Sequence, residues 1–266
     1  MSGAGDDLGR HWFEALADHL GEAYLRYSFT KGTQNEVAFL VDELGLRSGD
    51  RVLDVGCGPG RHAHALGLRG IEVHGVDISQ SFVELAEIDA PAGVTFERGD
   101  ARALAFSSEF DAVISLCQGA FGLASGGPHL DRPSGPVTSA GLVATRDPDP
   151  DARVLDGMAR ALRPGGRLAV SAFSAYFQVR WLEETDSFDA DAGVNHERTA
   201  LRSPLGEEAT HDLWTTCFTP RELRLLAARS GLEVRDIWSV TPGEYARRRP
   251  DLDHPEFLMV AVRPPG

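Results

Sequence analysis

Glycine and aspartate residues with the spacing of a nucleotide-binding loop lie between positions 51 and 61. The run reads Arg51-Val52-Leu53-Asp54-Val55-Gly56-Cys57-Gly58-Pro59-Gly60-Arg61, an apolar stretch followed by three glycines at alternate positions. A helix-like segment follows, so the pattern predicts the strand, turn and helix of a βα unit. Glycine suits such a turn because, without a Cβ, its backbone can approach a ligand closely. A dinucleotide fingerprint would place its third glycine at position 61, where this chain has arginine.

The loop from Asp54 to Gly60 closely resembles the first motif of class I S-adenosylmethionine (SAM) dependent methyltransferases. The resemblance covers roughly residues 51–263 and implies an α/β, Rossmann-like fold. That fold is a doubly wound, seven-stranded sheet whose last strand is antiparallel. The resemblance also implies SAM as the cofactor, an N-terminal helical cap and a methyltransferase domain. The expected division is residues 1–50 for the cap and 51–266 for the domain, with insertions at about 123–150 and 174–218.

Two further acidic residues follow the next two predicted strands. Asp77 lies 23 residues beyond Asp54, near the roughly 20-residue offset at which an acid meets a ribose in βαβ nucleotide sites. In the resembled family this acid binds both ribose hydroxyls, and the position of Asp100 and Ala101 contacts adenine. A backbone carbonyl at Leu116 or Cys117 is expected to contact the methionine amine. The expected cofactor residues are Tyr27, Lys31, Asp54, Gly56, Cys57, Gly58, Gly60, Asp77, Ile78, Asp100, Ala101, Leu116 and Cys117.

Candidate acceptor contacts lie after the fourth predicted strand and in the later insertion. Open parallel sheets bind ligands outside the carboxyl ends of their strands, so Gln118 and Phe121 are candidates for orienting the acceptor. The alternative is a loop that packs on the sheet. Related enzymes often build acceptor specificity in the segment matching 174–218, although a purely structural excursion is the competing interpretation. The expected substrate-binding residues are Tyr24, Gln118, Phe121, Tyr176, Arg180 and Trp214.

A general base is needed only if the acceptor must lose a proton, because the sulfonium of SAM already activates its methyl group. Histidine is the usual base, since its pKa lies near working pH. The candidate is His196, with Glu197 as partner or alternate and His129 or His211 in reserve. Adjacent residues of a strand point to opposite faces, so His196 and Glu197 should not both enter the pocket. An exposed or structural histidine is the competing interpretation.

Hydrophobic periodicity predicts the flanking elements. A one-sided stripe predicts a helix from Trp12 to Tyr27, and Thr33 to Glu36 has the pattern of a capping box that opens a second helix. Residues 123–150 are rich in Gly, Pro, Ser and Asp, which predicts either a lid over the pocket or disorder. Further helices are expected over 61–69, 81–88, 154–162 and 220–231, and strands over 52–55, 71–76, 94–97, 110–116, 168–173, 232–240 and 257–262.

The composition of the chain limits the kinds of partner and the location that can be expected. The formal net charge of −14 over 266 residues argues against sequence-independent nucleic-acid binding, which relies on Lys and Arg. No run approaches the roughly 18 apolar residues of a membrane span, and the first residues do not form a signal peptide. Cys57, Cys117 and Cys217 are odd in number and widely spaced, which predicts reduced thiols in the cytoplasm and no metal site. We expect a monomer or homodimer.

Three functional hypotheses remain. The first is a methyltransferase that acts on N or O of a small-molecule acceptor. The second keeps the fold but not the reaction, as a SAM-binding module or a partner subunit. The third is a nicotinamide dehydrogenase, which Arg61 disfavours.

Overall fold

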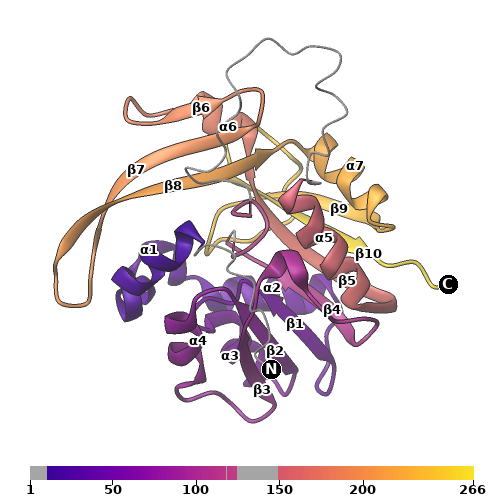
Figure 1. The fold of residues 1–266 in the computed structure, drawn as a ribbon. Coiled ribbons are helices and arrows are strands. Elements are labelled where there is room, and N and C mark those ends of the chain that lie inside the picture. Colours follow the sequence, from indigo (N-terminus) through magenta and orange to yellow (C-terminus); the bar gives the residue numbers. More distant parts are fainter. Residues whose placement is uncertain (1–10, 118, 125–148) are drawn as a thin grey trace, which may run out of the picture.

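The computed structural model describes residues 11–117, 119–124 and 149–266 (Figure 1). Its core is a sheet in the order β3-β2-β1-β4-β5-β10-β9. The first five of these strands are mutually parallel, and β10 runs antiparallel to both β5 and β9. This arrangement confirms the Rossmann-like fold with an antiparallel last strand. The strands are β1 (Arg51–Val55), β2 (Glu72–Asp77), β3 (Val94–Arg98), β4 (Phe110–Ser115), β5 (Leu162–Ser174), β9 (Glu233–Val240) and β10 (Glu256–Val262).

Helices cover both faces of this sheet, which explains why its central strands are nearly continuous apolar runs. On one face, α2 (Thr33–Glu43) and α3 (Arg61–Gly67) pack in a cluster that includes Leu40, Leu66 and Leu258. On the other, α5 (Pro150–Ala161) and α7 (Pro220–Arg229) pack with Met158, Leu223 and Met259. The alternation of Leu258 and Met259 between the two clusters is the period of two expected of a strand.

The helix predicted from Trp12 to Tyr27 is shorter in the structure. Helix α1 (Trp12–Leu20) ends at Gly21, whose φ of 44° breaks the helical backbone. Two 3₁₀ segments follow, η1 (Gly21–Arg26) and η2 (Ser28–Thr30). The apolar stripe continues through these turns, which is why the sequence suggested one long helix.

The capping box predicted at Thr33 is wrong. Helix α2 has Gly32 as its N-cap and no side-chain cap, and the Glu36 carboxylate points instead into a buried ionic group. The corresponding prediction at the start of α7 is confirmed. Thr219 and Glu222 form a reciprocal capping box with Pro220 in the first turn.

The insertion after β5 forms a short helix and an antiparallel ribbon. Helix α6 (Ala175–Arg180) precedes β6 (Ser187–Asp189), β7 (Val194–Arg202) and β8 (Glu208–Phe218). The β7–β8 hairpin arches over α1 in Figure 1. Its last residues pair in parallel with the end of β5, so the described residues form a sheet of ten strands. The hairpin is therefore tied directly to the edge where ligands bind in open α/β sheets.

The remaining elements are short. They are α4 (Gln80–Glu87), whose N-cap is Ser79, and η3 (Ala101–Ala103). Most of the insertion predicted at 123–150 lies outside the described residues. No helix in the described part of the chain has both the length and the apolar character that a bilayer crossing requires.

Candidate functional site

The three glycines of the first loop serve different purposes. Gly56, Gly58 and Gly60 all have positive φ, at 72°, 54° and 78°. A Cβ on Gly56 would lie 2.0 Å from the carbonyl carbon of Gly119. A Cβ on Gly60 would lie 2.9 Å from the Cβ of Ala86. A Cβ on Gly58 would meet nothing closer than 4.0 Å. Packing therefore explains Gly56 and Gly60, whereas the backbone at Gly58 remains open to a ligand.

Gly119 provides a test of this close backbone approach. Gly119→Ala should destabilise the chain by roughly 1–3 kcal/mol and weaken binding of S-adenosylhomocysteine (SAH), because its Cβ would lie 2.0 Å from the Gly56 carbonyl oxygen. Calorimetric SAH titration and denaturant unfolding measure the two effects. The control for SAH affinity is Gly206→Ala in the β7–β8 turn, where no described residue lies within 4 Å; its φ of 85° means that this variant also loses stability through backbone strain, but it should bind SAH normally. Unchanged SAH affinity in Gly119→Ala would show that the contact does not shape the site.

Asp77 ties the glycine loop to the end of β2. Its side chain is buried, its Oδ2 accepts a hydrogen bond from the Gly58 N–H at 2.8 Å, and its Oδ1 accepts one from the Ser79 N–H at 2.9 Å. Each carboxylate oxygen keeps a second lone pair. Burial raises the pKa of Asp77 to about 6, although the backbone hydrogen bonds oppose this. The carboxylate is thus fixed in place and can still accept two more hydrogen bonds.

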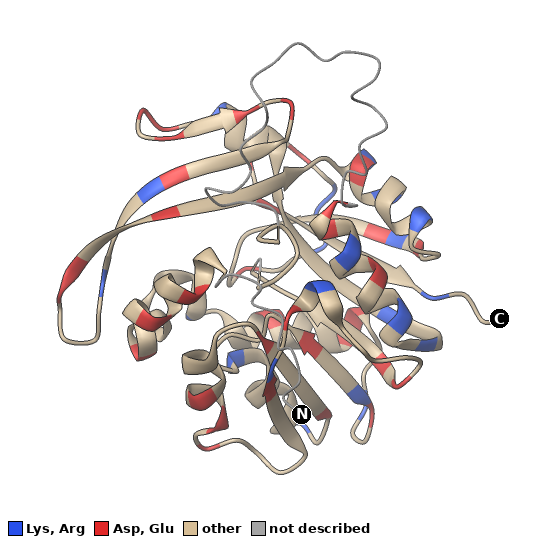
Figure 2. Ribbon diagram, viewed as in Figure 1, with Lys and Arg blue, Asp and Glu red and all other residues tan. Residues whose placement is uncertain are grey.

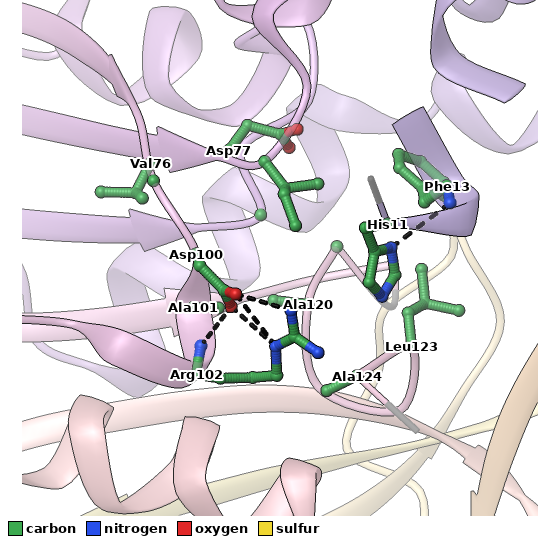
Figure 3. Close-up of a pocket in the computed structure, with 14 residues that line it drawn as sticks. His11, Phe13, Val76, Asp77, Asp100, Ala101, Arg102, Ala120, Leu123 and Ala124 are labelled. Carbon is green, nitrogen blue, oxygen red and sulfur yellow. Dashed lines mark hydrogen bonds and ion pairs between the residues drawn. The ribbon is translucent and has the colours of Figure 1, made fainter. Parts of the chain in front are cut away.

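A cavity lies between Asp77, the end of β3 and the start of α1 (Figure 3). Five of the predicted cofactor residues line it: Gly56, Asp77, Ile78, Asp100 and Ala101. The sequence did not indicate the other lining residues, which include His11, Phe13, Arg102, Gly119, Ala120, Leu123 and Ala124. The cavity therefore joins residues from five separated stretches of chain.

Asp100 is held by a residue that the sequence analysis did not single out. Arg102 donates from its Nε to both carboxylate oxygens of Asp100, at 2.9 and 3.0 Å, and from Nη2 to Oδ2 at 2.6 Å (Figure 3). Burial acts to raise the pKa of Asp100, but these hydrogen bonds and the charge of Arg102 outweigh it, so the pKa is lowered. Asp100 is therefore an oriented carboxylate on the cavity wall. The Asp-x-Arg spacing was the available sequence signal.

Helix α1 closes one side of the cavity. His11, its N-cap, accepts a hydrogen bond from the Phe13 N–H on Nδ1, and burial lowers the pKa of its ring. Glu14 pairs with Arg98 of β3 at 2.7 Å, and the Phe13 ring packs edge-on against Phe82 of α4. These contacts hold the start of α1 against the sheet, as expected of an N-terminal cap.

Arg61, directly after the glycine loop, belongs to a buried ionic group. Its Nη1 lies 2.5 Å from Glu36 Oε2, and its Nη2 lies 2.7 Å from the Cys117 sulfur. Glu36 is fully buried and also bonds His62 Nε2 at 2.7 Å and the Gly243 N–H at 2.8 Å. Burial opposes ionisation of Glu36, but His62 and Arg61 outweigh it and lower its pKa to about 2. The group joins α2, the glycine loop and the loop after β4.

Glu36, His62 and Cys117 could be mistaken for a metal site, because their ligand atoms lie within 4.8 Å of one another. Arg61 already supplies a positive charge to two of them. Burial also raises the pKa of the Cys117 thiol. The donor set therefore fits an ionic bridge better than a metal ion.

Asp54, at the end of β1, is the buried acid of the first motif. It is 1% exposed, and its Oδ2 has no hydrogen-bond partner among the described residues. Burial raises its pKa to about 7. A buried carboxyl oxygen without a donor is costly, which suits a site completed by a ligand N–H. Together with the open Gly58 backbone and the Asp77 oxygens, this observation fits the polar groups of SAM.

Eight predicted cofactor residues are not part of the cavity lining: Tyr27, Lys31, Asp54, Cys57, Gly58, Gly60, Leu116 and Cys117. Tyr27 is half-buried with its ring stacked on Phe29, and Lys31 is exposed. Cys57 and Leu116 are buried beside the loop ends, and the Cys117 N–H is bonded to the Ser171 hydroxyl.

The predicted acceptor residues are dispersed. Phe121 is fully buried and stacks on Phe218 in the core at 4.7 Å, so the alternative of a loop that packs on the sheet describes it better. Arg180 pairs with Asp253 at 2.8 Å, and Tyr176 is exposed on α6. Tyr24 packs against Phe82 and Phe29, and Trp214 against Trp12. Gln118 and His129 lie outside the described residues.

The two candidate bases lie on opposite faces of the hairpin, as predicted. His196 pairs across the strands with Trp214, stacks on it at 4.9 Å, and bonds Asp212 Oδ1 through Nε2 at 2.8 Å. Glu197 pairs with Leu213 on the other face. His211 lies 4.9 Å from the His19 ring, and burial lowers its pKa.

Known proteins share this sequence pattern and fold. Residues 46–217, more than half of the chain, match the family described as a methyltransferase domain. A ubiquinone biosynthesis O-methyltransferase of Pseudomonas putida is 27% identical over 206 residues, covering 76% of this chain and 72% of that protein.

Two solved structures share the fold. The CcbJ methyltransferase of Streptomyces caelestis has a TM-score of 0.73 at 18% identity, covering 96% of this chain and 99% of that one. SAM-bound CalS10, an amino pentose methyltransferase of Micromonospora echinaspora, has a TM-score of 0.58 at 21% identity over 91% and 95% of the chains. The chain belongs to the methyltransferase family and is a class I SAM-dependent methyltransferase.

Proposed function

We propose that this enzyme methylates N or O of a small-molecule acceptor, with the adenosyl group of SAM held in the cavity beside Asp77. The observation that carries the proposal is the Asp77 carboxylate, which Gly58 and Ser79 fix at the cavity wall with lone pairs to spare. A carboxylate matches two adjacent ribose hydroxyls better than a short neutral side chain does.

The neighbouring residues then take the roles that the first motifs imply. Asp100 and the Ala101 amide face the adenine, Gly56 lines the cavity, and the backbone at Gly58 leaves room for the ligand. Asp54, with the backbone carbonyl of Leu116 or Cys117, receives the methionine amine. Arg61 and Glu36 hold the glycine loop against α2. When bound, SAM supplies a methyl group activated by its sulfonium, so the chain's task is to orient the acceptor and exclude water.

A small-molecule acceptor is supported by the printed names of similar proteins, among them the ubiquinone biosynthesis and amino pentose methyltransferases. The acidic net charge disfavours a nucleic-acid substrate, and acidic positions are spread over strands, helices and loops (Figure 2). Three free cysteines support a reducing, cytoplasmic location. We propose His196 or Glu197 as the base, and a monomer or homodimer as the working state.

Calorimetric titration with SAH tests the proposal directly. Micromolar or tighter binding by the full chain is expected, together with methylation of a small-molecule acceptor. Absence of SAH binding would contradict it.

The pH dependence of SAH binding follows from Asp77. Burial raises its pKa from 3.8 to about 6, so its carboxylate is increasingly protonated below that pH. SAH affinity should therefore rise with pH. The part of this rise that belongs to Asp77, up to about tenfold per pH unit from pH 5, should level off above about pH 6, and Asp54, with a pKa of about 7, should add a second rise above it. The folded state holds the Asp77 proton more tightly than the unfolded state does, so the group's contribution to stability falls as pH rises from about 4 to about 6. Asp77→Asn should remove this step in the binding profile; a step that persists would belong to another group.

A further inference from the structure

Three acidic side chains gather at the base of the hairpin, next to the end of β5. Glu197 is on β7, and Asp186 and Glu183 lie in the turn before β6, where the Asp186 N–H donates to the Glu183 carbonyl at 3.1 Å. Burial first, and then the charges of Asp186 and Glu183, raise the pKa of Glu197. These three residues are called the Glu197 group below.

A buried amide completes the Glu197 group. Asn195 is only 4% exposed, and its Nδ2 lies 3.5 Å from Asp186 Oδ2, so its side chain reaches the acids. Its Oδ1 is buried without a hydrogen-bond partner among the described residues. A buried acceptor that lacks a donor destabilises the folded state, so it indicates a missing N–H or O–H. The chain has therefore brought together carboxylate and amide oxygens that all accept hydrogen bonds.

The hairpin places this site on the side of the cofactor residues. Asn195 and Glu197 pair with Thr215 and Leu213, which alternate along the same face of β8 as Cys217. Cys217 is in turn paired in parallel with Phe173 at the carboxyl end of β5.

Tyr24 connects the two regions. Leu213 and Tyr24 pack against the same apolar cluster of α1. The Tyr24 ring packs on Phe82, which also packs against Phe13 of the cavity wall. Glu197 thus shares the face of the hairpin on which Leu213 packs toward Tyr24, whereas His196 stacks on Trp214 of the other face, which contacts Trp12 of α1.

We propose that Glu197, Asp186 and the Asn195 Oδ1 bind the protonated amine of the acceptor, which makes the enzyme an N-methyltransferase for amines. The inference rests on the proposed function and names its substrate class. An ammonium group offers three N–H donors and a positive charge to three acceptors, whereas a hydroxyl offers one donor. Glu197 also has the chemistry of a base: its carboxylate takes one proton from the ammonium and leaves a neutral amine with a free lone pair. Its raised pKa suits that exchange.

Two probes of similar shape test the inference: benzylamine, protonated at neutral pH, and benzyl alcohol. Their affinities for the full chain are measured at pH 7 by ligand-observed NMR titration, with and without SAH. We expect benzylamine to bind at least about tenfold more tightly than benzyl alcohol. Glu197→Gln should reduce that preference to near one, with SAH affinity unchanged. Removing one of three neighbouring acids relieves repulsion, so this variant should fold, and its melting temperature verifies that.

The control is Glu208→Gln, at the distant end of the hairpin, where Glu208 is exposed and paired with Arg202. It should keep the full preference for benzylamine. Equal affinity of the two probes, binding of neither, or a preference that survives in the double variant Glu197→Gln/Asp186→Asn would overturn the inference. Failure to bind SAH would instead contradict the proposed function, because the probe titrations without SAH report on the Glu197 group alone.

Discussion

Asp77→Ala should lower SAH affinity by roughly 100- to 10,000-fold. Two hydrogen bonds from ribose hydroxyls to a carboxylate contribute about 1.5–3 kcal/mol each, and every 1.4 kcal/mol is tenfold in affinity. The same substitution leaves the Gly58 and Ser79 N–H groups without the acceptor that now orders the loop. Isothermal titration of the full chain with SAH measures the loss.

Asp111→Asn is a matched control for Asp77. Asp111 also accepts a backbone hydrogen bond, from the Arg51 N–H, and pairs with Arg163, but it lies at the amino end of β4, the opposite edge of the sheet. The Asp111→Asn variant should bind SAH with the same affinity as the unmodified chain. If Asp77→Ala bound SAH as well as this control does, the ribose assignment would be lost.

Arg61→Met should destabilise the chain by about 3–5 kcal/mol. Glu36 is fully buried with a pKa of about 2, and removing its guanidinium partner leaves a charge that His62, the Cys117 thiol and the Gly243 N–H offset only in part. Denaturant unfolding with an unchanged slope measures the difference in the free energy of unfolding. The double variant Glu36→Leu/Arg61→Met should be more stable than Arg61→Met, since it removes the buried charge as well.

The exposed pair of Glu22 and Arg26 is the control for this prediction. Both side chains are 63% exposed, so Glu22→Gln should change stability by less than about 1 kcal/mol. An Arg61→Met variant as stable as this control would show that the buried group does not hold the glycine loop to α2.

The sequence was sufficient wherever a local pattern decided the structure. The apolar run ending at Asp54 and the spaced glycines predicted β1 and its turn, and the offset to Asp77 predicted the acid at the end of β2. Thr219 and Glu222 predicted the start of α7 because the two partners of that capping box are only three residues apart along the chain. In each case the interacting groups are neighbours along the chain.

Contacts between distant residues account for the failures. Glu36 has the spacing of a capping residue, but its partners Arg61 and Gly243 are supplied by other elements and outcompete the local bond. The hydrogen-bond partner of His196 is Asp212 on the facing strand, a pairing that the sequence around His196 did not indicate. Phe121 could have faced a pocket or the core, and the stacking on Phe218 decides that. Pairings of this kind depend on strand register, which one sequence does not reveal.

The most direct test of the cofactor site is a crystal structure of the chain with SAH. We expect the adenosyl group in the cavity between Gly56 and Ala101, with both ribose hydroxyls about 2.5–3.0 Å from the Asp77 oxygens. An adenosyl group bound elsewhere, or ribose hydroxyls turned away from Asp77, would contradict the account.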